Sequence, residues 1–190
     1  MSIDRRSEIV KAASESFALY GYKNTTMDQV ARLANVGKGT IYTFFKNKEE
    51  LFNEIVITLI EEMQAAAKTA IEDELSFQEK VHQAVYKMLE YRREHQLIIK
   101  LFQEKRDLGT PAVEVMMQKF EDTILSFIEE KVKLAIENGE IRECDPELTA
   151  YVIFKLYIAL IFDWEKSREP LTKEDIASLF EFYLFKGLSE

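Results

Sequence analysis

The stretch GYKNTTMDQVARLANVGKGTIYTFFKNKEEL, residues 21–51, contains two short helical patterns joined by a turn. Thr26 followed by Gln29 forms a capping-box pattern, which predicts the start of a helix. Apolar residues then recur at helical spacing as far as Ala34, and a turn that contains Gly37 ends the first pattern.

The second pattern is short, with Ile41 and Phe45 as its inward pair. Because so short a helix is unstable on its own in water, the rest of the fold has to hold it. Two helices joined by a turn of three or four residues fit a helix-turn-helix unit, whose second helix enters the major groove of DNA. The residues left facing outward are Lys38, Gly39, Thr40, Tyr42, Thr43 and Phe44.

These outward residues have the chemistry of a DNA-reading surface. Lys38 can donate to a base edge or a phosphate, and Thr40 and Thr43 can hydrogen-bond or contact a thymine methyl group. Gly39 leaves out a side chain where the backbone would approach DNA. The alternative is a turn between core helices whose polar groups are only solvated. Phosphate is favoured at helix N-termini, which we expect to carry Thr25, Thr26 and Lys48.

Helical patterns continue along the chain without sustained strand alternation, so we expect an all-α fold of about nine helices. Gly21 is placed to end a first helix, and Asn47 to cap a long fourth helix. We expect two domains, residues 1–47 and 48–190, with the fourth helix as their connector. Further helix starts are indicated by Ser76 with Glu79, Pro111, Asp145 with Pro146, and Thr172 with Asp175.

Charge is distributed unevenly over the 190 residues, whose net charge is −9. Residues 1–50 hold eight basic and six acidic groups, which leaves a net charge of −11 on residues 51–190. A nearly neutral head on an acidic body permits DNA binding by the head. Cys144 is the only cysteine, and the N-terminus has no apolar leader segment, so we expect a cytoplasmic protein.

The segment GYKNTTMDQVARLANVGKGTIYTFFKNKEELF resembles the DNA-binding domain of the TetR/AcrR family of bacterial transcriptional regulators, over roughly residues 5–55. The resemblance implies a three-helix DNA-binding domain, a connecting fourth helix and a divergent helical domain that binds a ligand and dimerises. Two positions depart from the family pattern. Gly37 stands where members often carry Ser or Thr, and Phe44 where they often carry His or Tyr.

The last two helical patterns are apolar on nearly every side, in residues 151–164 and 176–188. A helix that is apolar all round has to be buried on more than one face. Burial against a second copy gives a homodimer through these two helices, as the resemblance also implies. The alternative is a pair of central core helices in a monomer.

The middle helices carry many aromatic and methionine side chains, which we expect to line an apolar cavity for a hydrophobic small-molecule inducer. Arg93 is placed to meet an anionic head group. The alternative for most of these residues is a place in an ordinary core. The candidate ligand-binding residues are Tyr86, Met88, Arg93, Phe102, Met116, Phe120, Tyr151, Phe154 and Tyr157.

The sequence predicts a ligand-responsive DNA-binding regulator, a repressor released from a near-palindromic operator by its inducer. It shows no phosphate-binding glycine loop, nucleophile elbow or paired catalytic constellation, so we expect no enzyme activity, cofactor, metal site or membrane partner. The alternative function is a helical small-molecule carrier, or an enzyme with a vestigial DNA-binding head.

Overall fold

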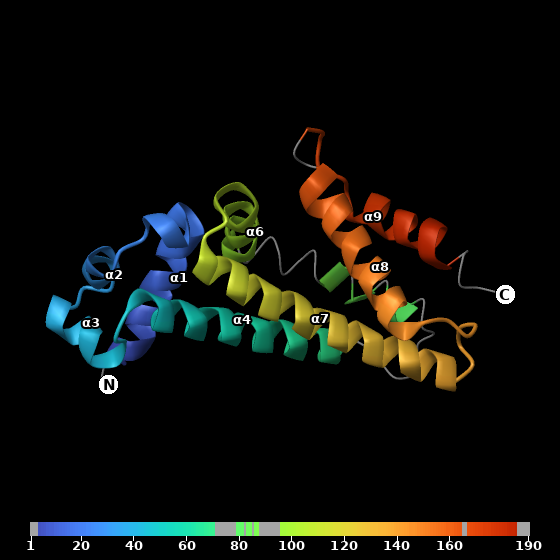
Figure 1. Ribbon diagram of the computed structural model, residues 1–190, viewed down its shortest axis with the longest axis horizontal. Helices are drawn as coiled ribbons and strands as arrows, with labels where there is room; N and C mark the ends of the chain where they lie inside the picture. The colour runs from blue at the N-terminus through green and yellow to red at the C-terminus, as the bar shows by residue number, and fades with distance from the viewer. Residues whose placement is uncertain are drawn as a thin grey trace. The chain divides into compact units, whose positions relative to one another are not determined.

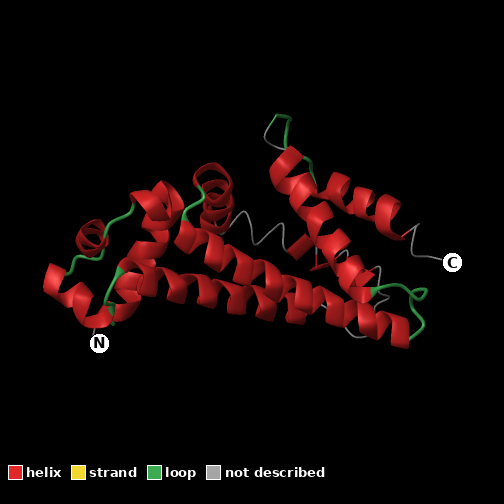
Figure 2. Cartoon of the chain, viewed as in Figure 1, coloured by secondary structure: helices red, strands yellow, loops and turns green. Residues whose placement is uncertain are grey.

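The computed structural model describes residues 4–70, 79–81, 83–84, 86–87, 96–164 and 167–185, and these residues form helices and connecting turns (Figures 1 and 2). The predicted all-α fold is confirmed, with the helix-turn-helix at its N-terminal end. The elements in order are α1 (Arg5–Asn24), α2 (Met27–Leu33), α3 (Lys38–Phe44), α4 (Lys48–Ala70), α6 (Gln96–Leu108), α7 (Pro111–Glu137), α8 (Pro146–Ile158), η1 (Ala159–Asp163), α9 (Lys173–Phe180) and η3 (Glu181–Phe185).

Side-chain caps start several of these helices where the sequence predicts them. The hydroxyl of Thr26 accepts from the Gln29 amide at 3.2 Å, and Asn47 Oδ1 accepts from the Glu50 amide at 2.8 Å. The predicted capping box of Thr172 and Asp175 is also present. Each cap satisfies an amide that has no partner within its own helix.

The turn between α2 and α3 is made by Asn35 rather than by a glycine. Asn35 has a left-handed φ of 53°, and the amide of Val36 bonds the carbonyl of Ala31 at 2.9 Å. The Asn35 amide bonds the Arg32 carbonyl at 3.2 Å, so α2 ends in a Schellman motif. Gly37 has an ordinary φ of −68° and is the N-cap of α3 without a side-chain bond.

The described chain divides into two compact units. The first unit is Met1–Glu62 with Arg92–Phe120, and the second unit is Met63–Tyr91 with Glu121–Glu190. In the first unit α6 packs along α1. The compact unit around the N-terminal helices therefore extends past residue 47 and includes α6. The boundary at residue 47 stays a prediction about function, with DNA binding before it and ligand binding after it.

The core of the first unit joins the N-terminal helices to the start of α4. Phe17 and Phe52 pack edge to face with ring centroids 5.4 Å apart, and Tyr22 lies 4.6 Å from Phe52. Ile41 and Phe45 are buried in the same unit. Their burial anchors α3, as the inward pair predicted from the sequence requires.

The core of the second unit is built from α7, α8 with η1, and α9 with η3. One face of each of these helices is buried in a shared cluster. The cluster contains Val132, Ala135, Ile153, Tyr157, Ile161, Ile176, Phe180 and Leu184.

Candidate nucleic-acid interface

The exposed face of α3 is the centre of the candidate interface. Gly39, Tyr42 and Thr43 are exposed, and Thr40 is partly exposed. Thr43 donates its hydroxyl hydrogen to the Gly39 carbonyl at 3.0 Å, which leaves its methyl group and oxygen lone pairs available. A Cβ atom added at Gly39 would meet no other atom within 4 Å. The backbone of α3 is therefore open to a close approach from outside.

Lys38, the first residue of α3, is also exposed, but its ammonium group has an acidic neighbour. Its Nζ atom donates to Asp28 Oδ2 of α2 at 3.0 Å. The hydrogen bond that Lys38 donates to Asp28 and the negative charge of that carboxylate together raise the pKa of Lys38. A phosphate or base edge that binds Lys38 has to compete with Asp28.

The two neighbouring threonines have different places. Thr26 is exposed at the N-terminus of α2, where a phosphate can approach. Thr25 is 0% exposed, and its hydroxyl lies 2.9 Å from the Gly21 carbonyl and 3.1 Å from the Ser16 hydroxyl. The expectation that the Thr25 side chain contacts phosphate does not fit this position, because its hydroxyl is enclosed between α1 and the turn.

Lys48 is half-buried at the start of α4, and its ammonium group points to backbone. Nζ donates to the carbonyls of Tyr22 at 2.8 Å and Thr25 at 2.9 Å, and it lies 4.2 Å from the centre of the Tyr22 ring. Burial lowers the pKa of Lys48, and the charge of Glu104 partly opposes this shift. Lys48 therefore fastens the segment before α2 rather than reaching outward.

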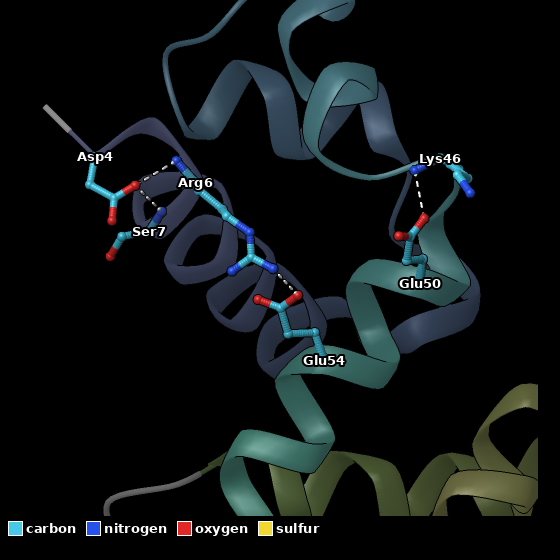
Figure 3. Close-up of polar contacts among 6 residues, drawn as sticks. All are labelled: Asp4, Arg6, Ser7, Lys46, Glu50 and Glu54. Atoms are coloured by element: carbon cyan, nitrogen blue, oxygen red, sulfur yellow. Dashed lines mark hydrogen bonds and ion pairs between the residues drawn. The ribbon is translucent and has the colours of Figure 1, made fainter.

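Polar contacts fix the first two turns of α4 (Figure 3). The Glu50 carboxylate accepts from the Lys46 amide at 2.8 Å, and the Glu50 amide in turn donates to Asn47 Oδ1. Arg6 of α1 reaches Glu54 of α4 in an ion pair. These contacts hold the segment that follows α3 in place.

Glu104 of α6 also belongs to this region, and the sequence does not predict its role. It is 4% exposed and accepts hydrogen bonds from the amides of Tyr22 and Lys23, at 2.6 and 2.9 Å. An acidic residue near the end of a helix carries no sequence signal for such a role. Only the packing of α6 along α1 brings it to residues that lie about 80 positions earlier.

The candidate ligand-binding residues are distributed over both units. In the first unit, Phe102 and Phe120 pack edge to face at 6.1 Å, and Met116 is buried. In the second unit Phe154 and Tyr157 are buried, Tyr151 is exposed, and the Tyr86 hydroxyl donates to Glu174 at 3.0 Å. Met88 and Arg93 lie outside the described residues.

Two family models match the chain. Residues 9–55 match bacterial regulatory proteins of the tetR family, and residues 74–188 match the tetracyclin repressor-like C-terminal domain. The chain is also 60% identical over 189 residues to an uncharacterized HTH-type transcriptional regulator, YhgD, of Bacillus subtilis (strain 168), a match that covers 100% of this chain and 99% of the relative. The chain belongs to the tetR family of bacterial regulatory proteins.

Two solved structures share the fold of this tetR-family chain. FadR, a fatty acid degradation regulator from Bacillus halodurans, has a TM-score of 0.80 and 18% identity, covering 97% of this chain and 98% of its own. AibR in complex with isovaleryl coenzyme A and operator DNA has a TM-score of 0.71 and 22% identity, covering 96% and 98%. At these identities the likeness is one of fold.

Membrane-spanning helices and metal-binding clusters are both absent from the described part of this tetR-family chain. Within the described ranges, no helix has the length and apolar character needed to cross a bilayer. The same residues contain no group of three or more His, Cys, Asp or Glu side chains arranged to hold a metal ion.

Proposed function

We propose that this tetR-family chain is a repressor that binds a near-palindromic operator through α3 and releases it when a hydrophobic small molecule binds. The observation that carries the proposal is the face of α3, where small and hydrogen-bonding groups are exposed on a helix anchored by the buried Ile41. Such a face fits the major groove, in which base edges are read by hydrogen bonds and methyl contacts. The proposed base-reading residues are Lys38, Gly39, Thr40, Tyr42 and Thr43.

Phosphate contacts are proposed at the edges of this face. Thr26, exposed at the N-terminus of α2, and the amides of the first turn of α4 offer donors near a positive helix end. Lys48 and Thr25 support this surface from within, since their polar groups bond the turn between α1 and α2. We infer that residues 1–47 bind DNA and that residues 48–190 bind the inducer and dimerise, in the cytoplasm where the chromosome lies.

The DNA-binding proposal is tested with a duplex that covers the region upstream of the protein's own gene. In a mobility-shift titration we expect the double variant Lys38→Ala, Thr40→Ala to lose at least about tenfold in specific affinity, since each good base contact contributes about 1–3 kcal/mol of discrimination. The matched control is Lys119→Ala, Thr123→Ala, which removes the same residue types from α7. Unchanged specific affinity of the α3 double variant would contradict the proposed surface.

A homodimer is supported by the exposed apolar face of the second unit. While one face of α8 and of α9 with η3 is buried in the unit's own core, another face carries large exposed apolar side chains. A second copy covers such a face by a two-fold contact, which places two recognition helices on one near-palindromic site. The exposed residues are Leu148, Tyr151, Val152, Phe182 and Tyr183.

We also propose that a hydrophobic inducer with an anionic head group releases the protein from its operator. It is supported by the many aromatic and methionine side chains among the buried residues of the body, which adapt to apolar ligands. The proposed contacts are Phe102, Met116 and Phe120 in the first unit, Tyr86, Tyr151, Phe154 and Tyr157 in the second, and Met88 and Arg93 outside the described residues.

The inducer proposal is tested with a series of acyl coenzyme A esters and free fatty acids. An inducer has to bind the state that does not fit the operator more tightly, and a coupling of about 1–3 kcal/mol is typical. We therefore expect the active compounds to raise the thermal midpoint and to weaken operator binding about five- to 150-fold. Thermal stabilisation with unchanged operator affinity would contradict release by these ligands.

A further inference from the structure

At Gly21, near the C-terminal end of α1, the backbone leaves the helical conformation. The segment from this kink to the start of α2 is held by two charged side chains from other helices. We call residues 21–25 the Gly21 turn. Glu104 of α6 accepts from its amides at Tyr22 and Lys23, one carboxylate oxygen to each amide. Lys48 of α4 donates to its carbonyls at Tyr22 and Thr25. All of these residues belong to the first unit.

The backbone of the Gly21 turn is adapted to the carboxylate. Gly21 has φ 82° and ψ 167°, a region of backbone conformation that is essentially restricted to glycine. A Cβ atom at this position would lie 2.5 Å from Glu104 Oε2. The absent side chain thus makes room for the carboxylate, and the unusual backbone turns two successive amides toward it.

Glu104 is itself fixed from a third direction. The hydroxyl of Thr110, in the turn between α6 and α7, donates to Glu104 Oε1 at 2.8 Å. With this bond the buried carboxylate has three donors, and a buried charge is stable only when it is hydrogen-bonded in this way. These three bonds fix the position of the carboxylate. Because two of the donors are amides of the Gly21 turn, the fixed carboxylate also fixes the backbone of that turn.

We propose that Glu104 is a positioning residue for DNA binding: by fixing the Gly21 turn it sets the orientation of α2 and α3 relative to α1. The inference rests on the proposed function. The turn leads directly into α2, whose N-cap Thr26 follows it. A carboxylate outside the DNA-binding helices thereby determines what fraction of the molecules has α3 placed for the major groove, and apparent affinity scales with that fraction.

The direction in which DNA affinity changes when Glu104 loses its charge distinguishes a positioning role from simple repulsion between the carboxylate and DNA phosphates. Removing a negative charge from a DNA-binding protein ordinarily strengthens its binding, because fewer phosphates are repelled. Glu104→Gln removes such a charge but also places an NH₂ group against one of the two backbone amides. The proposal therefore predicts weaker specific binding from a change that makes the protein less acidic.

The experiment compares wild type, Glu104→Gln and Glu121→Gln. The control removes a largely buried carboxylate that pairs with Lys155 on α8. Specific affinity is measured on the upstream duplex, and non-specific affinity on a scrambled duplex of the same length. For Glu104→Gln we expect specific affinity about tenfold lower, the size expected when a charged hydrogen bond is lost, with an unchanged salt slope since no phosphate contact is removed. Non-specific affinity is expected to stay equal or rise slightly.

Hydrogen exchange supplies a readout that does not involve DNA. The amides of Tyr22 and Lys23 are expected to exchange faster in Glu104→Gln than in wild type, and at the wild-type rate in Glu121→Gln. Thr110→Val removes one of the three donors and is expected to lower specific affinity about two- to threefold. If Glu104→Gln does not fold at the assay temperature, Thr110→Val is the variant that tests the positioning role of Glu104.

The outcomes separate the inference from the proposed function. Wild-type binding that does not distinguish the upstream duplex from the scrambled duplex overturns the proposed function and the inference with it. If wild type discriminates and Glu104→Gln discriminates equally well or better, only the inference is overturned. Retained specific affinity in Thr110→Val overturns it in the same way when Thr110→Val is the deciding variant.

Discussion

Tyr22 lies where α1 meets α4 and α6, with its ring packed against the rings of Phe17 and Phe52. Burial raises the pKa of its phenol above the ordinary value of 10.0, and the charges of Glu49 and Glu104 raise it further. The folded protein therefore keeps this proton at pH values at which the unfolded chain has released it. The stability that Tyr22 contributes is complete below about pH 10 and is lost as the pH rises further.

We predict that Tyr22→Phe weakens the alkaline loss of stability. As the pH rises from about 8 to about 11, the free energy of unfolding should fall less in Tyr22→Phe than in wild type. Lys48, whose pKa is lowered by burial, contributes a slope of the opposite sign, but it is present in both proteins. Urea unfolding at several pH values measures the difference, with the exposed Tyr20→Phe as control. Parallel pH curves for wild type and Tyr22→Phe would contradict the prediction.

At the scale of the element, α3 has only seven residues and contains a glycine at its second position. Gly39→Ala should stabilise the free protein by up to about 1 kcal/mol, because alanine favours the helix and its methyl group meets open space. If Gly39 faces DNA, the same methyl group should lower operator affinity about tenfold or more. Thermal unfolding and mobility-shift titration of one variant measure the two opposite effects.

Gly37→Ser is the matched comparison for Gly39→Ala. A serine at this N-cap can bond a free amide of α3, which should stabilise the helix by a few tenths of a kcal/mol. Since Gly37 precedes the proposed base-reading face, operator affinity should be retained or increased. A loss of affinity in Gly37→Ser as large as that in Gly39→Ala would show that the methyl group at residue 39 has no special place.

Local chemistry made most of the element boundaries predictable. Thr26, Asn47, Asp145 and Thr172 cap helices through residues three positions away, and such contacts can be read from the sequence. Contacts between distant segments could not be read. Thr25 and Thr26 are adjacent residues of the same type, but Thr25 is buried and Thr26 is exposed. The difference arises because Thr25 packs against α1, which the sequence does not show.

The candidate site was likewise predictable only in part. The exposed face of α3 follows from helical periodicity, since Ile41 and Phe45 face inward. The direction of Lys48 depends on where the carbonyls of Tyr22 and Thr25 lie after folding. Asp28 lies ten residues before Lys38, and their ion pair depends on the angle between α2 and α3. Neither feature leaves a pattern in the sequence.

At the scale of the whole molecule, the exposed apolar residues of α8 and η3 predict how the protein assembles. Val152→Glu places a charge on the proposed dimer face and should weaken dimerisation about hundredfold or more, since an unpaired buried charge costs several kcal/mol. Operator affinity should fall as well, because two linked heads bind more tightly than separate ones. Analytical ultracentrifugation over a range of concentrations measures the dimer constant.

The control for this change is Val115→Glu. Val115 is a valine of α7 that is 69% exposed, compared with 45% for Val152, so the control introduces the same charge at another exposed apolar position. It should leave the dimer constant and the operator affinity near the wild-type values. Equal dimerisation of the two variants would place the contact between copies elsewhere on the molecule.

The pairing of Gly21 with Glu104 also limits how hybrid regulators can be built. A chimera that grafts residues 1–47 onto another family member's body carries Gly21 along but leaves its carboxylate behind. The graft then depends on whatever side chain the new body presents against that glycine. A hybrid that keeps its operator preference should therefore be assembled with the α6 segment transferred together with the N-terminal helices, so that the exchangeable module is discontinuous in sequence.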